Sequence, residues 1–487
     1  MVLGLRPAVV VTWLWVLGCP SPEPPPPPPT EPPPETGHTG GEGPTGDTGT
    51  APVPWVGDLA LRVDPEVSLM LHATFDDPGV ADVWVEYRFE GDDWQVAPLV
   101  APGEAVLLGI PEQTAVEARA VAVIDGETTV GPTATATTGS LPQALLRPTV
   151  PTYDPALASP EGYALISVAS GSFTFQGPYF LEIVDRAGRV VWYSLVPGDL
   201  FSFYPSVAFD GTHIWYDAED IFGFGSGSPH VTRRTLDGRW SVSHAAPSAG
   251  QAFAEGPDDS FFYELRGNRH GVVQLDAEGD PTLVWDCDAH MESIGEPGGD
   301  CLLNGCNWSE SRGTVLASQF ETGTVFEVDL ATGLAVRQMG QLEPGEPYTF
   351  DPPDSMFAYQ HWPHWTPEGT LFVSTHLPCG GEQNCSEITG KPGIQVAAEY
   401  EVDDSTRTLT RIWSHTSTDL WATQAGEAYR LPNGNLIQGY GQDGAVREIA
   451  PDGRTAWEVG WPKDGAGYRM VGHVSLIADL YALNVGH

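Results

Sequence analysis

The sequence predicts an all-β protein in which a small β-sandwich precedes a six-bladed β-propeller. Three observations predict it: alternating apolar and polar runs between 55 and 138, a strand unit that recurs six times between 155 and 485, and 56 glycines with 45 prolines among 487 residues. Alternation with a period of two is typical of strands with one buried face. Long all-strand repeats stack radially into a propeller. A β-helix is the structural alternative, and its repeats are shorter.

The charge of the chain excludes one class of partner. There are 65 Asp and Glu against 22 Lys and Arg, a formal net charge of -43. So acidic a surface repels phosphate backbones, which excludes nucleic-acid binding. It argues equally against attachment to an anionic membrane surface by charge alone.

The N-terminus has the form of a targeting signal. Arg6 precedes an apolar run at 7–18 that is too short to span a membrane. The string Val16-Leu17-Gly18-Cys19 resembles the bacterial lipoprotein signal. The resemblance implies a signal peptide at 1–18, lipidation of Cys19, and a protein anchored in the bacterial cell envelope, at the outer membrane, facing the periplasm or the surface. The alternative is an ordinary signal peptide with a chance cysteine. Residues 19–54, rich in Pro, Gly and Thr, are predicted to be a linker, stiff at first and then flexible.

Residues 55–138 are predicted to form the sandwich. Val83–Arg88 and Ala115–Val123 alternate with a period of two, and turns are marked by Gly91-Asp92-Asp93 and Asp125-Gly126. The order of these strands, with Leu108–Pro111 between them and a Thr-rich last strand, resembles a fibronectin type III-like domain.

The repeat between 155 and 485 decides the fold. Each unit has a glycine turn, an apolar strand, a second strand, an Asp-Gly hairpin and a strand that carries tryptophan. The clearest copy runs from Arg430 to Trp457. Five of the six units end in a tryptophan: Trp192, Trp240, Trp285, Trp413 and Trp457. The six units predict six blades of three or four strands.

Several strings in this region share their form with a known family: Asp185–Trp192, Tyr359-Gln360-His361, Arg430–Asn435, Ile449–Trp457, Tyr468-Arg469 and Asp479–Tyr481. They make the region resemble the bacterial arylsulfate sulfotransferases. The resemblance implies a sandwich before a six-bladed propeller and transfer of a sulfuryl group from an aryl sulfate to a phenolic acceptor through a channel histidine. It also implies that no nucleotide cofactor is used; the sequence leaves a metal open. A histidine nucleophile divides such a transfer into two steps, and further histidines and an arginine stabilise the charge on oxygen.

Counting back eight residues from the turn before each unit predicts which residues line the axis: Phe203, Gln251, Gly305, His361 and Gly426. His361 is the one histidine among them and is the predicted nucleophile. The other candidates are His364, Arg430, Arg469 and Tyr204, the last standing where the resemblance implies an early histidine. The family's fourth-blade histidine is missing from Leu302–Asn307, and its arginine is missing near Gln319. Each candidate also has a structural interpretation: hydrogen bonding at a blade edge for the histidines, pairing with an acidic surface for Arg430, and locking of the first and last blades for Arg469.

The cysteines fit an oxidising compartment. We expect Cys379 to pair with Cys385 across a Gly-rich loop, and Cys287 to pair with Cys301 or Cys306. Cys306 lies next to Gly305, which leaves a catalytic thiol as an alternative. Two acidic groups, His290 with Glu292 and Asp217-Ala218-Glu219-Asp220, have no recognised metal-ligand spacing and are predicted to be acidic loops.

Two classes of function therefore stay open. One is a nucleotide-independent sulfotransferase, or a hydrolase or lyase on the same scaffold. The other is a non-catalytic surface propeller that binds a ligand or a protein. The sequence does not specify an oligomeric state, and it predicts contact with a membrane only through the lipid on Cys19.

Overall fold

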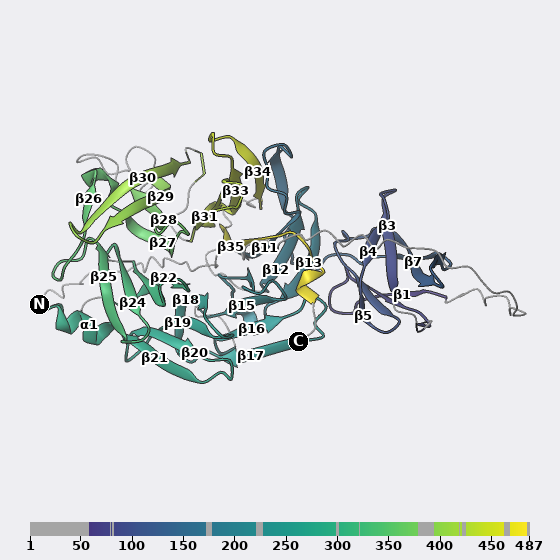
Figure 1. Ribbon diagram of the computed structural model, residues 1–487, viewed down its shortest axis with the longest axis horizontal. Helices are drawn as coiled ribbons and strands as arrows, with labels where there is room; N and C mark the ends of the chain where they lie inside the picture. The colour runs from purple at the N-terminus through teal and green to yellow at the C-terminus, as the bar shows by residue number, and fades with distance from the viewer. Residues whose placement is uncertain are drawn as a thin grey trace, which may run out of the picture.

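The computed structural model describes residues 58–484, apart from 78, 80–81, 172–177, 221–226, 299–300, 321, 378–393, 418, 421–424 and 462–467. Figure 1 shows a ring of sheets with a separate pair of sheets beside it. The one α-helix in this part of the chain is α1 (Cys287–Ser293). Short 3-10 turns are η1 (Pro197–Asp199), η2 (Pro353–Ser355), η3 (Gly441–Asp443) and η4 (Ala482–Asn484). In the described ranges, no helix has the length and apolarity needed to cross a bilayer.

The sandwich consists of two antiparallel sheets. One has the strand order β1 (Ala60–Val63), β2 (Leu71–Thr74), β6 (Glu104–Leu107), β5 (Leu99–Ala101). The other has the order β4 (Gln95–Ala97), β3 (Val83–Phe89), β7 (Ala115–Ile124), β8 (Glu127–Val130), and β9 (Ala134–Thr137) also pairs with β7. Along β3, Val85, Tyr87 and Phe89 are buried and the residues between them are not, as the period of two predicts.

The ring is a β-propeller of six sheets, which confirms the predicted fold class. Blades two to four are regular four-stranded sheets: β14 (Ser206–Val207), β15 (Ile214–Ala218), β16 (His230–Arg234), β17 (Ser241–Ala245); β18 (Ala249–Glu255), β19 (Phe261–Leu265), β20 (Gly271–Leu275), β21 (Pro281–Asp286); and β22 (Leu303–Ser309), β23 (Thr314–Gln319), β24 (Thr324–Asp329), β25 (Leu334–Gly340). Blade five is β27 (Ala358–Trp365), β28 (Leu371–Leu377), β29 (Ile394–Asp403), β30 (Thr408–Thr416), with β26 (Thr349–Asp351) at its outer edge.

Both ends of the propeller segment close the ring. Blade one is β11 (Tyr163–Gly171), β12 (Phe180–Asp185) and β13 (Val190–Leu195), and its inner strand is β35 (Tyr468–Ile477) from the end of the chain. Blade six is β31 (Ala428–Arg430), β32 (Leu436–Tyr440), β33 (Ala445–Ile449) and β34 (Thr455–Gly460), and its outer strand is β10 (Thr149–Tyr153), which comes before the first repeat. Closure of this kind pairs β11 with β35 and β34 with β10, so strands from the two ends of the chain complete blades one and six.

A buried ion pair joins the same two blades. Arg186, in the β12–β13 hairpin, lies 2.8 Å from Glu448 of β33, and both side chains are buried. Glu448 also accepts a hydrogen bond from Asn435, the last residue of the Leu-Pro-Asn-Gly-Asn string (2.6 Å). The Leu-Pro-Asn-Gly-Asn string therefore helps to hold Glu448 at the junction between blades one and six.

Two of the repeated tryptophans connect neighbouring blades. The Trp192 indole Nε1 of blade one donates to the Leu236 carbonyl in the hairpin of blade two (2.9 Å). In the same way, Trp457 of blade six donates to the Arg186 carbonyl in the hairpin of blade one (3.0 Å). Both rings are fully buried. At these two junctions the tryptophan therefore holds the hairpin of the next blade across the blade interface.

The sandwich packs against blade one. Leu69, Met70 and Leu108 belong to the same hydrophobic cluster as the core of that blade. The Tyr193 hydroxyl of β13 accepts a hydrogen bond from the Ser68 amide (3.0 Å). Beyond β35, the chain returns to the sandwich, where the Tyr481 hydroxyl accepts from the Leu108 amide (3.2 Å).

Candidate functional site

The repeat-derived axial positions lie where the inner strands meet. Gln251, Gly305 and His361 are on β18, β22 and β27, whereas Phe203 and Gly426 come just before β14 and β31. The counting rule finds no residue in blade one, because the inner strand of that blade is β35 from the other end of the chain. The residue that completes the ring there is His473, which sequence reasoning missed. Aligning Gly472-His473 with Gly426-Glu427 was the signal that could have found it.

We call six residues at this level, one from each blade, the axial ring: Tyr204, Gln251, Asn304, His361, Glu427 and His473. Four of them lie at breaks in strand register: Gln251 on β18, Asn304 on β22, His361 on β27 and His473 on β35. Bulges of this kind re-aim side chains and are over-represented beside functional sites. The ring consists of one phenol, two amides, two imidazoles and one carboxyl, and it includes no guanidinium or ammonium group.

The backbone around His361 is strained. Register shifts lie on both sides of His361, and two non-glycine residues next to it have left-handed backbones, Tyr359 with φ 49° and Trp362 with φ 57°. Each such residue costs about 1–2 kcal/mol. The His361 side chain itself is buried, with 1% of the residue exposed.

Trp362 of blade five contacts blade one at this level. Its indole stacks on the imidazole of His473, with 4.2 Å between ring centroids and an angle of 13° between planes. Trp362 belongs to blade five and His473 to blade one, so their contact spans the axis past blade six. Both residues are 1% exposed. The His473 amide donates to the Phe203 carbonyl (2.6 Å), which ties blade one to blade two.

A carboxyl lies beside His473. Glu427 Oε1 is 2.8 Å from His473 Nδ1 and accepts a hydrogen bond from the Val474 amide (2.6 Å). Burial raises the pKa of Glu427 well above its usual value and lowers that of His473 well below its own. Both shifts favour the uncharged form of each group, as expected for ionisable side chains with little access to water.

Two amides of the ring have unused hydrogen-bonding groups. Gln251 and Asn304 are both fully buried, and neither side-chain oxygen nor nitrogen has a partner within the described part of the chain. Buried polar groups of this kind are usually satisfied by internal water or a ligand. Both amides can therefore hydrogen-bond to internal water or to a polar ligand.

The structure does not join Arg430 to the axial ring. Arg430 forms an ion pair with Glu399 of β29 (3.0 Å), and its guanidinium lies 4.1 Å from the centroid of the Trp413 ring. These contacts correspond to the structural interpretation of Arg430 and leave its guanidinium between blades five and six. His364 Nδ1 contacts the Trp362 carbonyl (3.1 Å). Burial lowers the pKa of His364 to about 4, so this imidazole is neutral at pH 7.

The remaining two candidates are buried near the axis. Tyr204 is 1% exposed, and its amide donates to Asp217 (2.7 Å), whose pKa burial raises to about 6. Arg469 is 4% exposed and lies opposite Ser170 at the start of β35. The candidate residues therefore share the interior of the propeller, but as buried groups rather than as the lining of an open cleft.

An open pocket lies elsewhere, at the outer rim. Its volume is about 470 Å³, and it is formed by α1 after blade three, by β25 and the segment that follows it in blade four, and by the β29–β30 hairpin of blade five. We call it the rim pocket; its lining residues are His290, Ile294, Ala335, Val336, Arg337, Gln338, Gly345, Glu346, Tyr348, Asp404 and Arg407. The volume is in the range of small-molecule sites.

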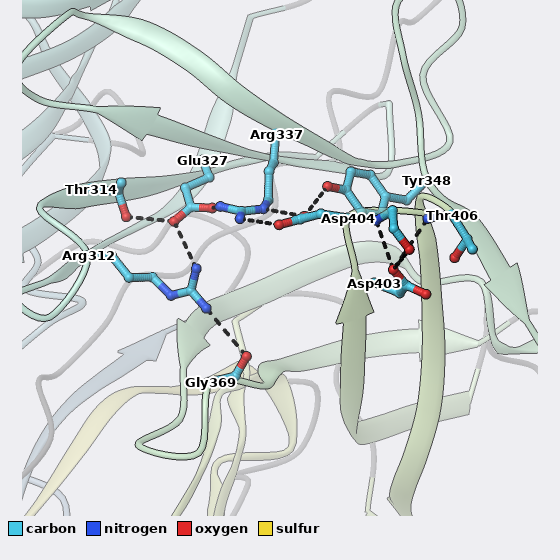
Figure 2. A network of polar contacts seen from close by, with 10 residues as sticks. Arg312, Thr314, Glu327, Arg337, Tyr348, Gly369, Asp403, Asp404 and Thr406 are labelled. Carbon is cyan, nitrogen blue, oxygen red and sulfur yellow. Dashed lines mark hydrogen bonds and ion pairs between the residues drawn. The ribbon is translucent and has the colours of Figure 1, made fainter.

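One arginine organises the floor of the rim pocket, as Figure 2 shows. Arg337 binds Asp404 through two parallel hydrogen bonds (2.7 and 2.6 Å) and forms an ion pair with the buried Glu327. Tyr348 donates its hydroxyl to Asp404 as well (2.6 Å). The Arg337 hydrogen bonds lower the pKa of Asp404 to about 2. The guanidinium is thereby committed to two carboxylates of the protein.

The mouth of the rim pocket is less tightly paired. Arg407 forms an ion pair with Glu346, and the Glu346 side chain is 73% exposed. Exposed pairs contribute about 0–1 kcal/mol, so a ligand can compete for either partner. His290 lies against the rings of Trp285 and Phe326, and burial lowers its pKa. No described residue hydrogen-bonds to its Nε2 atom.

The disulfide supports this pocket. Cys287 is bonded to Cys301, as predicted, which fixes the start of α1, the helix that carries His290. Cys306 does not take part in the disulfide; it is buried, and its thiol contacts the Phe262 carbonyl (3.9 Å). Cys19, Cys379 and Cys385 lie outside the described residues. Among the described residues, no three His, Cys, Asp or Glu side chains are placed to hold a metal ion.

Comparisons with known proteins give distant likenesses only. No protein-family model matches the chain, and no curated protein matches it either. Among solved structures, it is similar to a protein of unknown function from Bacteroides caccae, with 14% identity over 66% of this chain and 100% of that one and a TM-score of 0.40. It is also similar to a streptogramin B lyase, with 10% identity over 63% of this chain and 98% of that one and a TM-score of 0.34. A third similar structure is an auxiliary nutrient binding protein from Bacteroides ovatus, with 9% identity over 80% of this chain and 82% of that one and a TM-score of 0.35. Likenesses at this level carry no argument about activity.

Proposed function

We propose that the chain is a non-catalytic, ligand-binding propeller of the bacterial cell envelope, anchored through Cys19, and that its ligand occupies the rim pocket. The observation that carries this is the open pocket itself, with a polar floor held by Arg337 and an apolar wall that includes Val336. A rigid floor and a loosely paired mouth are what a binding site needs, because the floor costs little reorganisation when a ligand enters.

The contacts that the candidate residues make support ligand binding rather than sulfuryl transfer. An aryl sulfate is an anion, and its transfer needs cations or strong donors at the oxygens where charge develops. Arg430 is committed to Glu399 and Trp413. The six residues of the axial ring include no arginine or lysine, and Trp362 stacks on one of them, His473. The negative charge of the whole chain works further against capture of an anion.

Filling the rim pocket tests this proposal. Val336 is 51% exposed on the outer strand of blade four, so Val336→Trp introduces bulk without disturbing a core. Val130→Trp, at a 45% exposed position of the sandwich, is the matched control. In a thermal-shift screen of small organic ions, compounds that stabilise the wild type are expected to stabilise Val130→Trp but not Val336→Trp. Equal stabilisation of all three proteins would place the ligand elsewhere.

A second function, sulfuryl transfer through His361, is supported by one observation. The left-handed residues Tyr359 and Trp362 beside His361 store strain of the kind that clusters at active sites. The test is transfer from a chromogenic aryl sulfate to phenol. Catalysis at this site requires that His361→Ala loses about a hundredfold or more with an unchanged melting temperature. It also requires Arg430→Gln to leave the rate unaltered, because Arg430 contacts Glu399 rather than His361. A wild type without transfer rejects this function.

A further inference from the structure

The segments that line the rim pocket are strongly acidic. Residues 287–296, 334–348 and 403–407 together contain seven carboxylates and two arginines. The acids are Asp288, Glu292, Glu296, Glu343, Glu346, Asp403 and Asp404, and the arginines are Arg337 and Arg407. His290 adds no positive charge near neutral pH because burial lowers its pKa. Of these residues, Glu346, Asp404, Arg337 and Arg407 line the pocket itself, so the excess of acid comes from the residues that flank the lining.

The two arginines do not offset this for an anionic ligand. Arg337 donates to Asp404 and Glu327 and is therefore already saturated by carboxylates. Arg407 remains, but an anion that reaches it must lie beside Glu346. By contrast, Glu346 is largely exposed, and only its Oε2 atom accepts a hydrogen bond from a described residue. A cation can thus join Glu346 without breaking the buried part of the network in Figure 2.

An apolar wall faces these charges. Ile294 of the segment after α1, with Ala335 and Val336 of β25, lines the same pocket. Val336 is 51% exposed, so the apolar part of a ligand can cover it. The pocket therefore combines one accessible carboxylate with a few apolar side chains.

Resting on the proposed function, we infer that the rim pocket binds a small organic cation: an ammonium or guanidinium group carried on an apolar body. Glu346 contacts the cation, and Val336 with Ile294 covers the apolar part. The negative field of the chain raises the local concentration of such a ligand, and added salt weakens its binding.

Calorimetric titration of the purified full-length protein tests the inference with three probes of equal length: hexylamine, hexanoate and hexanol. We expect hexylamine to bind at least about tenfold more tightly than hexanoate, with hexanol between them. Glu346→Gln should weaken hexylamine by about fivefold, the upper range for an exposed charge pair. Glu127→Gln, an exposed position in the sandwich with the same change of charge, should leave binding unaltered. Val336→Trp should abolish binding of all three probes.

The outcomes separate this inference from the proposed function. If no probe binds, or if Val336→Trp binds as well as the wild type, the rim pocket is not the ligand site and the proposed function fails. If hexanoate binds as tightly as hexylamine and Val336→Trp abolishes both, the pocket stands and the cation is wrong. If Glu127→Gln weakens hexylamine as much as Glu346→Gln, the attraction belongs to the whole acidic surface, which also overturns the inference.

Discussion

Replacing Trp362 by glycine and by alanine tests whether the side chain that contacts blade one is held on a strained backbone. Both changes remove a fully buried indole and its stacking on His473, so both should lower the free energy of unfolding by about 3–5 kcal/mol. Alanine at φ 57° keeps the left-handed penalty of about 1–2 kcal/mol, whereas glycine has none. Glycine loses about 0.5–1 kcal/mol more chain entropy on folding. The glycine variant should therefore be more stable than the alanine variant by about 0.5–1 kcal/mol.

The order of the two variants is the decisive measurement. Urea unfolding followed by circular dichroism gives the midpoint of each. Trp192 is the matched control, because it is equally buried in β13 but does not have a left-handed backbone. There the usual order should hold, with glycine about 0.5–1 kcal/mol less stable than alanine. If glycine is also the less stable choice at 362, the backbone there is not strained and the support for a functional site at His361 disappears.

Three further predictions concern the disulfide, the buried acids and the anchor. Cys287→Ser should lower the free energy of unfolding by about 3 kcal/mol, since the bond closes a 14-residue loop, and should loosen the rim pocket, seen as faster proteolysis near α1; equal midpoints under oxidising and reducing conditions would contradict this. Burial raises the pKa of Glu182 from 4.5 to about 8, so between these values the folded state binds the extra proton. Stability should therefore fall as pH rises through that range, by up to about 1.4 kcal/mol per pH unit, and Glu182→Gln should flatten the decline; an unchanged pH profile would count against it. Cys19→Ala should move the protein from the membrane fraction to the soluble one, and retention in the membrane would reject the lipoprotein interpretation.

The fold could be predicted because its signals are local. The Asp-Gly hairpin and the following tryptophan lie within one unit, and Trp192 hydrogen-bonds to the hairpin of the next unit. The strand periodicity of the sandwich is local as well. The counting rule located the axis in five blades for the same reason, and it failed for His473 because chain closure places the inner strand of blade one at the opposite end of the sequence.

The candidate site could be predicted only in part. His361 was found from its place in the repeat, but its burial under Trp362 depends on a contact with a residue more than a hundred positions away. The engagement of Arg430 by Glu399 is another contact between separate blades. The rim pocket is built from three segments that share no motif, so nothing in the sequence marks Glu346 and Val336 as neighbours.

Because strands from both ends of the chain close the ring, strands that are made early find their partners only late in synthesis. β10 pairs with β34, and the contact of Thr149 with Gly460 spans 311 residues. At about 5–20 residues per second, a ribosome needs roughly 15–60 s to make that stretch. During this interval the edges of β10 and β11 that later pair with β34 and β35 have no partners and can pair with other chains. Slower translation therefore lengthens the period in which the nascent protein can aggregate before the ring closes.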